Sequence, residues 1–165
     1  METQELQTFV NALAETPEAV RQMVDGLASE ELTFKPSEKE FSILENICHL
    51  RDIEAEGYAF RIRKILSDRE PFLPDIDGDR LAAERSYNRQ NLRAALDVFA
   101  EERQKNVGLL RSLSPDQLKR GGFFETVGPV TLASLLQMMR EHDQSHLKDL
   151  SELRRILNER GKHER

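Results

Sequence analysis

Two histidines four residues apart, His142 and His146, are the side chains whose type and spacing most directly point to chemistry. On an α-helix this spacing directs both imidazoles from one face about one turn apart, the reach needed for two nitrogens to bind one metal ion. The competing interpretation is a pair of core histidines, each satisfied by a nearby carboxylate. Burying two imidazoles side by side without a shared partner costs several kcal/mol of desolvation, so the pair favours a metal site.

The pair lies within a long amphipathic stretch, which predicts one helix from Thr131, its cap, to Gly161, the residue after its last turn. The apolar residues of its stripe are spaced by three or four and are Leu132, Leu135, Met139, Leu150, Leu153 and Leu157. Both histidines fall on this stripe, so they are expected to face the interior. His163 follows Gly161 and is expected to be a solvent-exposed tail residue.

The first helix is predicted from an apolar stripe between residues 6 and 27. Thr16 followed by Pro17 has the form of a cap and a first helical residue, so this helix is expected to kink or restart there. Short capped turns are predicted at residues 29–32 and 114–118, each leading into a loop.

The second helix is predicted to begin at Ser42, which forms a capping box with Glu45, and to end near Leu66. Residues 67–79 contain two prolines and a glycine and are therefore a connection. Fully extended, such a segment spans roughly 43 Å, longer than a typical bundle. The third helix, residues 81–113, can thus begin at the same end as the second helix and run parallel to it.

A segment rich in glycine and proline separates the third and fourth helices and predicts a flexible loop; it contains Gly121, Gly122, Gly128 and Pro129. Four amphipathic helices with one long crossover between the second and third predict an all-α fold, a four-helix bundle. At 165 residues the chain has the size of one ordinary domain, so a single domain over residues 1–165 is expected.

The composition excludes several classes of partner. Acidic side chains outnumber basic ones by 30 to 24 and the two kinds are mixed along the chain, so no continuous basic face is offered to nucleic acid. A single cysteine, Cys48, indicates a reduced, intracellular environment. The N-terminus lacks the pattern of a signal peptide, and no apolar stretch approaches roughly 18 residues. A cytoplasmic protein without membrane contact is expected.

His49 is a third candidate, because it falls at the edge of the apolar arc of the second helix and could point inward at an open flank. Cys48 projects about 100° away on the same helix, which favours a buried structural thiol over a ligand. Glu45, Glu56 and Asp143 are either acceptors that orient an imidazole or surface acids, and the surface role is favoured for each. No second catalytic group stands out.

Two known metal-binding helix motifs fit less well. The sequence from His142 to His146 is similar to the H-E-x-x-H helix of zinc peptidases, but Asp143 is one methylene shorter than the general base, and no downstream ligand follows. A carboxylate-bridged di-iron bundle needs two E-x-x-H helices, and neither half of the chain supplies one.

Two segments of the chain, taken together, resemble the DinB-like (damage-inducible) superfamily. Residues 27–54 contain Phe41-Ser42-Ile43 and His49-Leu50-Arg51-Asp52, and residues 128–150 contain Thr131-Leu132 and His142-Asp143-x-x-His146-Leu147. The order and spacing of these short motifs, with the long crossover, extend the resemblance over nearly the whole chain. The family usually has Trp where this chain has Phe41, a departure that affects packing more than chemistry.

The resemblance implies a metal-binding four-helix bundle with up-down-down-up topology, commonly a homodimer. One histidine of the second helix and two of the fourth then bind a divalent ion, and they map to His49, His142 and His146. Zinc or nickel is the favoured ion, with iron or manganese as further options. Three neutral imidazoles leave coordination positions open, which is typical of catalytic sites.

Relatives with this pattern imply an enzyme that activates a small thiol or water, either a thiol transferase or a hydrolase. A thiol is preferred, because thiolate is the softer partner for zinc or nickel. Against this, the sequence has no cluster of Arg or Lys beside either histidine segment, other than Arg51 and Arg140, to hold the carboxylates of such a thiol. The alternative is a non-catalytic, metal-stabilised dimeric interaction module, which an occluded site would favour.

Overall fold

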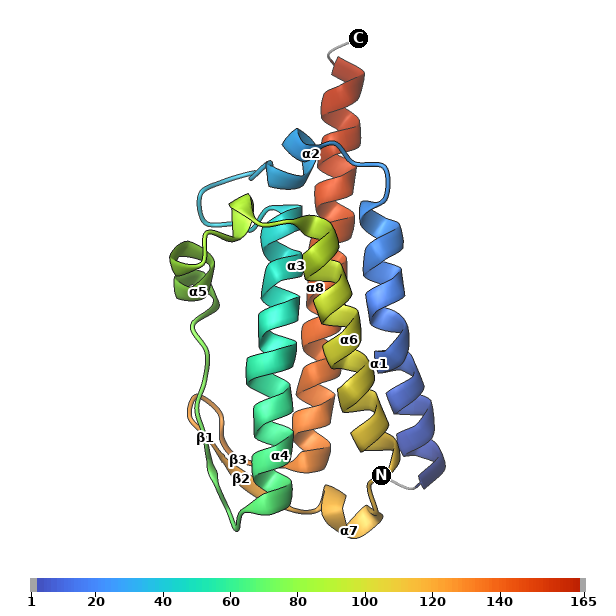
Figure 1. Cartoon of the computed structure of the whole chain (residues 1–165), viewed down its shortest axis with the longest axis vertical. Helices are drawn as coiled ribbons and strands as arrows, with labels where there is room; N and C mark the ends of the chain where they lie inside the picture. The colour runs from blue at the N-terminus through green and yellow to red at the C-terminus, as the bar shows by residue number, and fades with distance from the viewer. Residues whose placement is uncertain (1–2, 164–165) are drawn as a thin grey trace.

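The computed structural model, which describes residues 3–163, consists of four long helical rods standing side by side (Figure 1). The first rod is α1 (Thr3–Val24). The second rod consists of three consecutive segments, α3 (Ile43–Asp52), η1 (Ile53–Tyr58) and α4 (Ala59–Ser67). The third rod is α6 (Leu92–Arg111), and the fourth is α8 (Leu132–His163). The second rod and α6 run in one direction, and α1 and α8 run in the other (Figure 1). The predicted four-helix bundle with up-down-down-up topology and a long crossover is confirmed.

The second rod contains a π-helical turn that the sequence analysis did not predict. In η1 (Ile53–Tyr58) the backbone hydrogen bonds join residues five apart instead of four, which is the π-helical pattern, while α3 and α4 on either side are α-helical. Single π-helical turns of this kind occur often at functional sites. Its first turn carries Glu54, which is buried in the interior of the bundle.

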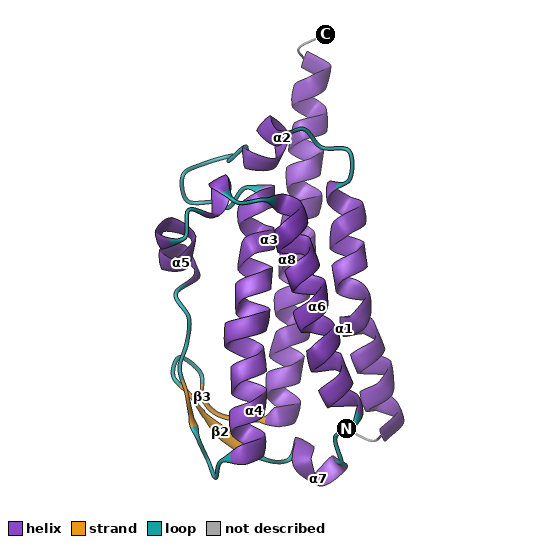
Figure 2. Ribbon diagram, in the orientation of Figure 1, coloured by secondary structure: helices purple, strands orange, loops and turns teal. Residues whose placement is uncertain are grey.

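Short elements cap the ends of the bundle and carry the crossover. They are α2 (Ser29–Thr33), β1 (Phe72–Leu73), α5 (Gly78–Glu84), the 3₁₀ turn η2 (Tyr87–Arg89), α7 (Pro115–Leu118), β2 (Gly121–Phe124) and β3 (Gly128–Thr131). The strands form a small sheet in the order β1-β2-β3, with β1 parallel to β2 and β2 antiparallel to β3 (Figure 2). The predicted short turns before each loop are confirmed, and Ser114 caps α7 as expected. The position before α2 is Ala28, which provides no side-chain cap; its amide donates to Glu31 instead.

The prediction of a flexible loop before the last helix was wrong, because that segment forms a hairpin. Its glycines permit close backbone approach rather than mobility. A Cβ atom at Gly122 would lie 2.6 Å from the carbonyl oxygen of Pro71, and one at Gly121 would collide with the Val130 carbonyl. Leu73, Phe124 and Val130 then fill the inner face of the sheet and are buried in the core.

Two helix boundaries differ from the sequence-based expectation. Of the two alternatives at Pro17, a kink or a restart, the restart does not occur: α1 continues through the proline, and Leu13 and Val20 on either side of it are buried. The third helix begins at Leu92 rather than near residue 81. Ser86 has a left-handed backbone with φ of 48°, which interrupts the helical path. The side chain of Asn91 then accepts from the Ala94 amide and caps α6.

The last helix begins as predicted but ends later. Thr131 Oγ1 accepts a hydrogen bond from the Ser134 amide at 3.1 Å, which caps the helix. Gly161 does not have the left-handed backbone of a terminating glycine, so α8 continues to His163, which is exposed. Within residues 3–163, each helix is either too short or too polar to cross a lipid bilayer.

The core consists of two apolar clusters separated by a polar layer. The first includes Leu6, Leu13, Tyr58, Ile62, Leu110, Leu135 and Met139, and the second includes Val20, Ile43, Ile47, Leu50, Phe99, Leu150 and Leu153. On α8 the residues between the clusters are 140–146, which contain both candidate histidines. The buried polar residues of the bundle therefore lie near its middle, between the two apolar clusters.

Candidate metal centre

Three histidines meet in the polar layer. His49 comes from α3, and His142 and His146 come from α8; one nitrogen of each lies within 4.8 Å of the others. The Nε2 atoms of His49 and His142 are 3.1 Å apart. Ligand nitrogens on a tetrahedral zinc ion, with bonds of ~2.0–2.1 Å, are about 3.3 Å apart, so the spacing suits ligands of one ion. The structure thus brings together the three residues predicted from the sequence, all of them only partly buried.

Asn46, which the sequence analysis missed, fixes the orientation of His146. The Asn46 amide donates to the Ser42 carbonyl oxygen at 2.9 Å, so its Oδ1 atom is the acceptor that faces His146. That oxygen lies 2.7 Å from His146 Nδ1, which therefore carries the proton. The Nε2 lone pair is left to face the other two histidines. Ser42 is the cap of α3, so the predicted capping box also supports the site.

His49 is held between the start of its helix and the crossover. Its ring lies 5.5 Å from the ring of Phe41, measured between centroids. On the other side, Gly78 of α5 packs so closely that a Cβ atom there would come within 2.6 Å of His49 Cε1. The Nδ1 atom of His49 is buried and has no hydrogen-bond partner among residues 3–163.

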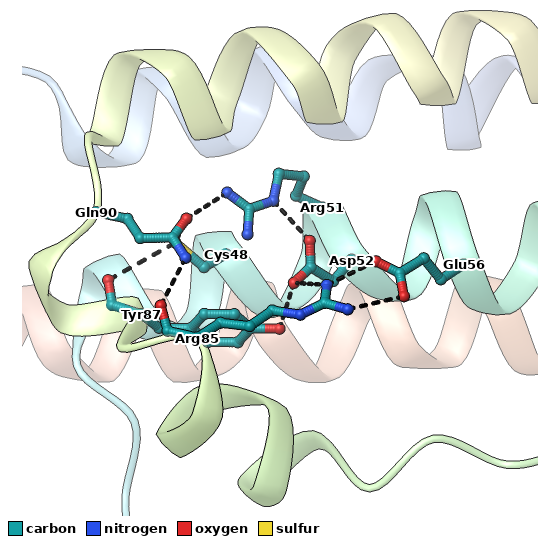
Figure 3. Close-up of polar contacts among 7 residues, drawn as sticks. All are labelled: Cys48, Arg51, Asp52, Glu56, Arg85, Tyr87 and Gln90. Carbon is teal, nitrogen blue, oxygen red and sulfur yellow. Dashed lines mark hydrogen bonds and ion pairs between the residues drawn. The ribbon is translucent and has the colours of Figure 1, made fainter.

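An ion-pair network holds the crossover against the second rod (Figure 3). The buried carboxylate of Asp52 accepts from Arg51 at 2.7 Å, from Arg85 at 2.8 Å and from the Tyr87 hydroxyl at 2.6 Å. Arg85 also pairs with Glu56. Burial acts to raise the pKa of Asp52, but the bonds from Arg51, Tyr87 and Arg85 hold it below its ordinary value. These contacts fix the segment that brings Gly78 onto His49.

The environment keeps the three imidazoles neutral. Burial is the main cause, and it lowers the pKa to about 4 for His49, about 2 for His142 and about 4 for His146. Neighbouring imidazoles lower the pKa of His49 and His142 further. Tyr58 lies edge-on to His142 with 5.9 Å between ring centroids and shields it on the side of the first apolar cluster. At neutral pH all three side chains have lone pairs available for a metal ion.

Comparison with known proteins agrees with this architecture. Residues 12–150 match the family model of the DinB superfamily. The chain belongs to the DinB superfamily. Among curated proteins, none matches it significantly. Among solved structures, it is similar to YfiT from Bacillus subtilis, with a TM-score of 0.89 and 21% identity over 96% of this chain and 90% of YfiT. YfiT is described as a probable metal-dependent hydrolase with an unusual four-helix bundle topology.

Beside the histidines, this DinB-superfamily chain buries a second polar cluster. Arg103 of α6 donates to both carboxylate oxygens of Asp143, at 2.6 and 2.8 Å, and to Glu54 at 2.9 Å. Asn106 donates to the other oxygen of Glu54 at 2.7 Å, and Thr16 donates to Asp143 at 2.8 Å. The five residues, from all four rods, are each at most 5% exposed.

The predicted roles of the acidic residues were only partly correct. Asp143 was expected to be a surface acid and is instead buried in this cluster, because Arg103 faces it from α6. Glu45 is also buried, since its carboxylate closes the capping box at the Ser42 amide. Glu56 is exposed, as predicted. Cys48 is a buried free thiol whose pKa burial raises to about 11, which agrees with the predicted structural role.

A cavity of about 280 Å³ lies behind two residues that contact the histidines. Its wall includes Asn46 and Phe41, which contact His146 and His49, but none of the three histidines. Asp79 and Asp149 also line it, and Leu153 and Ile156 contribute apolar surface. A small, mainly acidic cavity therefore adjoins the residues around the site.

The sequence did contain a signal for the buried cluster. Arg103 follows Phe99 and precedes Val107 by four residues each, so it lies on the apolar stripe of its helix. A charged residue on such a stripe is buried and paired far more often than it is free. Gly78 and Asn46 carried no comparable signal, because their roles depend on contacts with distant segments.

Proposed function

We propose that this protein is a metal-dependent hydrolase whose divalent ion is held by His49, His142 and His146. The observation that carries the proposal is the convergence of three neutral, partly exposed imidazoles from two helices within 4.8 Å. A further support is the shared fold with YfiT, which is described as a probable metal-dependent hydrolase.

The donor set suits a divalent ion of borderline softness, with zinc or nickel favoured. When bound, such an ion acts as a Lewis acid that polarises a carbonyl or phosphoryl group and makes water a stronger nucleophile at neutral pH. Three protein ligands leave at least one coordination position free for water and substrate.

The surrounding residues orient the ligands and shape the pocket. Asn46 fixes the tautomer of His146 through its 2.7 Å contact. Phe41 and Gly78 cover the two sides of His49 and limit its contact with water. The adjoining cavity of about 280 Å³ matches a small molecule rather than a polymer.

Water is favoured over a thiol as the activated nucleophile, which reverses the preference drawn from the sequence. Arg51 is engaged with Asp52 and Gln90, and the Arg140 guanidinium lies over the ring of Phe9. Arg51 is therefore not free to hold a carboxylate of a low-molecular-weight thiol. The acidic wall of the cavity also repels such an anion.

The test is a screen of the zinc- and nickel-loaded protein against ester, amide and phosphoester substrates, with and without chelator. Parallel reactions contain cellular thiols and an electrophile. We expect hydrolysis that chelator abolishes and that His142→Ala removes together with the bound metal. His163→Ala is the matched control, since His163 is exposed at the end of α8. Stoichiometric metal in His142→Ala, or thiol transfer without hydrolysis, would overturn the proposal.

A further inference from the structure

The buried cluster beside the histidines contains an unequal number of charges. Arg103 is the only cationic side chain bonded to Glu54 or Asp143 among residues 3–163. All four carboxylate oxygens of these two residues accept hydrogen bonds, from Arg103, Asn106 and Thr16. Two carboxylates and one guanidinium, in their ordinary charge states, give the cluster one net negative charge.

An unbalanced charge buried this deeply is costly unless another charge compensates it. The side chains of Arg103, Glu54 and Asp143 are only 2%, 1% and 4% exposed, so water screens them little. Buried ion pairs also rarely increase stability over an apolar core of the same shape. Stability alone thus gives little reason for such a cluster in the middle of a bundle.

The cluster lies directly beside the histidine site. Asp143 follows His142 in α8, and Glu54 lies one turn before Tyr58, whose ring contacts His142. The charges of the cluster reach the histidines in both senses: Asp143 acts to raise the pKa of His146 against burial, whereas Arg103 contributes to the lowered pKa of His142. A dication at three neutral ligands has no anionic ligand of its own, so fixed negative charges close to the site contribute to its binding.

We propose that Glu54, Asp143 and Arg103 act as a positioning and charge-balancing cluster for the metal site, in which the excess carboxylate compensates the charge of the bound dication. This inference rests on the metal site of the proposed function, but not on hydrolysis. The cluster holds α8 at His142 through Arg103, and its net charge sets how tightly the ion is bound. In the metal-free protein, the excess negative charge of the cluster has no compensating cation.

The test is to remove each kind of charge from the cluster and to measure zinc affinity by competition with a chromogenic chelator. Glu54→Gln makes the cluster neutral and should weaken zinc binding about 10-fold. Arg103→Met removes the cation, and one of the two neighbouring buried carboxyl groups is then expected to take up a proton, so zinc binding should not weaken, while the metal-free variant unfolds at lower urea. Structural damage alone would weaken binding in both variants. Glu101→Gln, an exposed residue of the same helix, is the matched control and should change nothing.

If Arg103→Met does not fold, Arg103→Lys keeps the charge with altered geometry and decides the question. Zinc affinity close to that of wild type in Arg103→Lys, with the loss in Glu54→Gln, supports the charge-balancing role. Equal losses in both variants, or no loss in Glu54→Gln, would overturn it. A wild-type protein that binds no zinc would instead refute the metal site itself, which separates the two proposals.

Discussion

Replacing Gly78 by alanine tests whether the crossover helps to position His49. The added methyl carbon would lie 2.6 Å from His49 Cε1 and 2.9 Å from Nδ1, whereas ordinary contact begins at 3.4 Å. The imidazole or α5 must therefore move by roughly 0.8 Å, several times the tolerance of about 0.2 Å for a metal ligand. The crossover resists the movement, since Arg85 and Tyr87 bind Asp52 on the second rod.

We expect Gly78→Ala to lower zinc affinity by about 10–100-fold, the range seen when groups that orient a ligand are changed. The metal-free protein should lose about 1–3 kcal/mol of stability from overpacking. Competition with a chromogenic chelator measures the affinity, and urea denaturation followed by circular dichroism measures the stability.

Gly108→Ala is the matched control, because a Cβ atom at this position in α6 meets no atom within 4 Å. It should leave zinc affinity unchanged and stabilise the protein by about 0.5–1 kcal/mol through helix propensity. A folded Gly78→Ala variant that binds zinc as tightly as wild type would refute the reasoning, because His49 would then not be a ligand held by this contact.

Four further outcomes are expected. Arg103→Met should destabilise the metal-free protein by about 3–5 kcal/mol, because Glu54 and Asp143 stay buried without their cation; an unchanged urea midpoint would contradict this. Asn46→Leu should reduce zinc affinity about 10–100-fold with the helical circular dichroism signal retained, and wild-type affinity would remove its orienting role. Burial lowers the pKa of the three histidines to between about 2 and about 4, below the ordinary 6.5, so the unfolded metal-free chain binds more protons below pH 6.5. The free energy of unfolding of the metal-free protein should therefore be highest above pH 6.5 and decrease towards pH 4, and it should decrease less steeply in His142→Gln. An equal pH dependence in wild type and His142→Gln would argue against the lowered pKa of His142. The homodimer expected from the family stays a prediction, and light scattering at micromolar concentration should give twice the mass of the chain, whereas the mass of one chain would contradict it.

The sequence by itself determined the helical elements and most of their starting points. Apolar periodicity and side-chain caps act within a few residues, so Ser42 and Thr131 cap their helices through bonds to amides three residues away. The length of the connection after residue 66 also allowed the second rod and α6 to run in parallel, as they do in the structure. The pairing of His142 with His146 needed only the pitch of one helix.

The sequence identified His49 as a ligand only through the family resemblance, and the tertiary structure decided which other distant residues surround the site. His49 and His142 are separated by 93 residues, and Arg103 lies 40 residues from Asp143. The hairpin, too, depends on the approach of residues 71–73 to Gly122 rather than on local propensity. Helix periodicity assigns each residue to a face but not to a partner on another helix, because rotation and height of the rods are set by packing of the whole core. For this reason the charge balance around the histidines follows only from the tertiary structure, in which residues of all four rods meet.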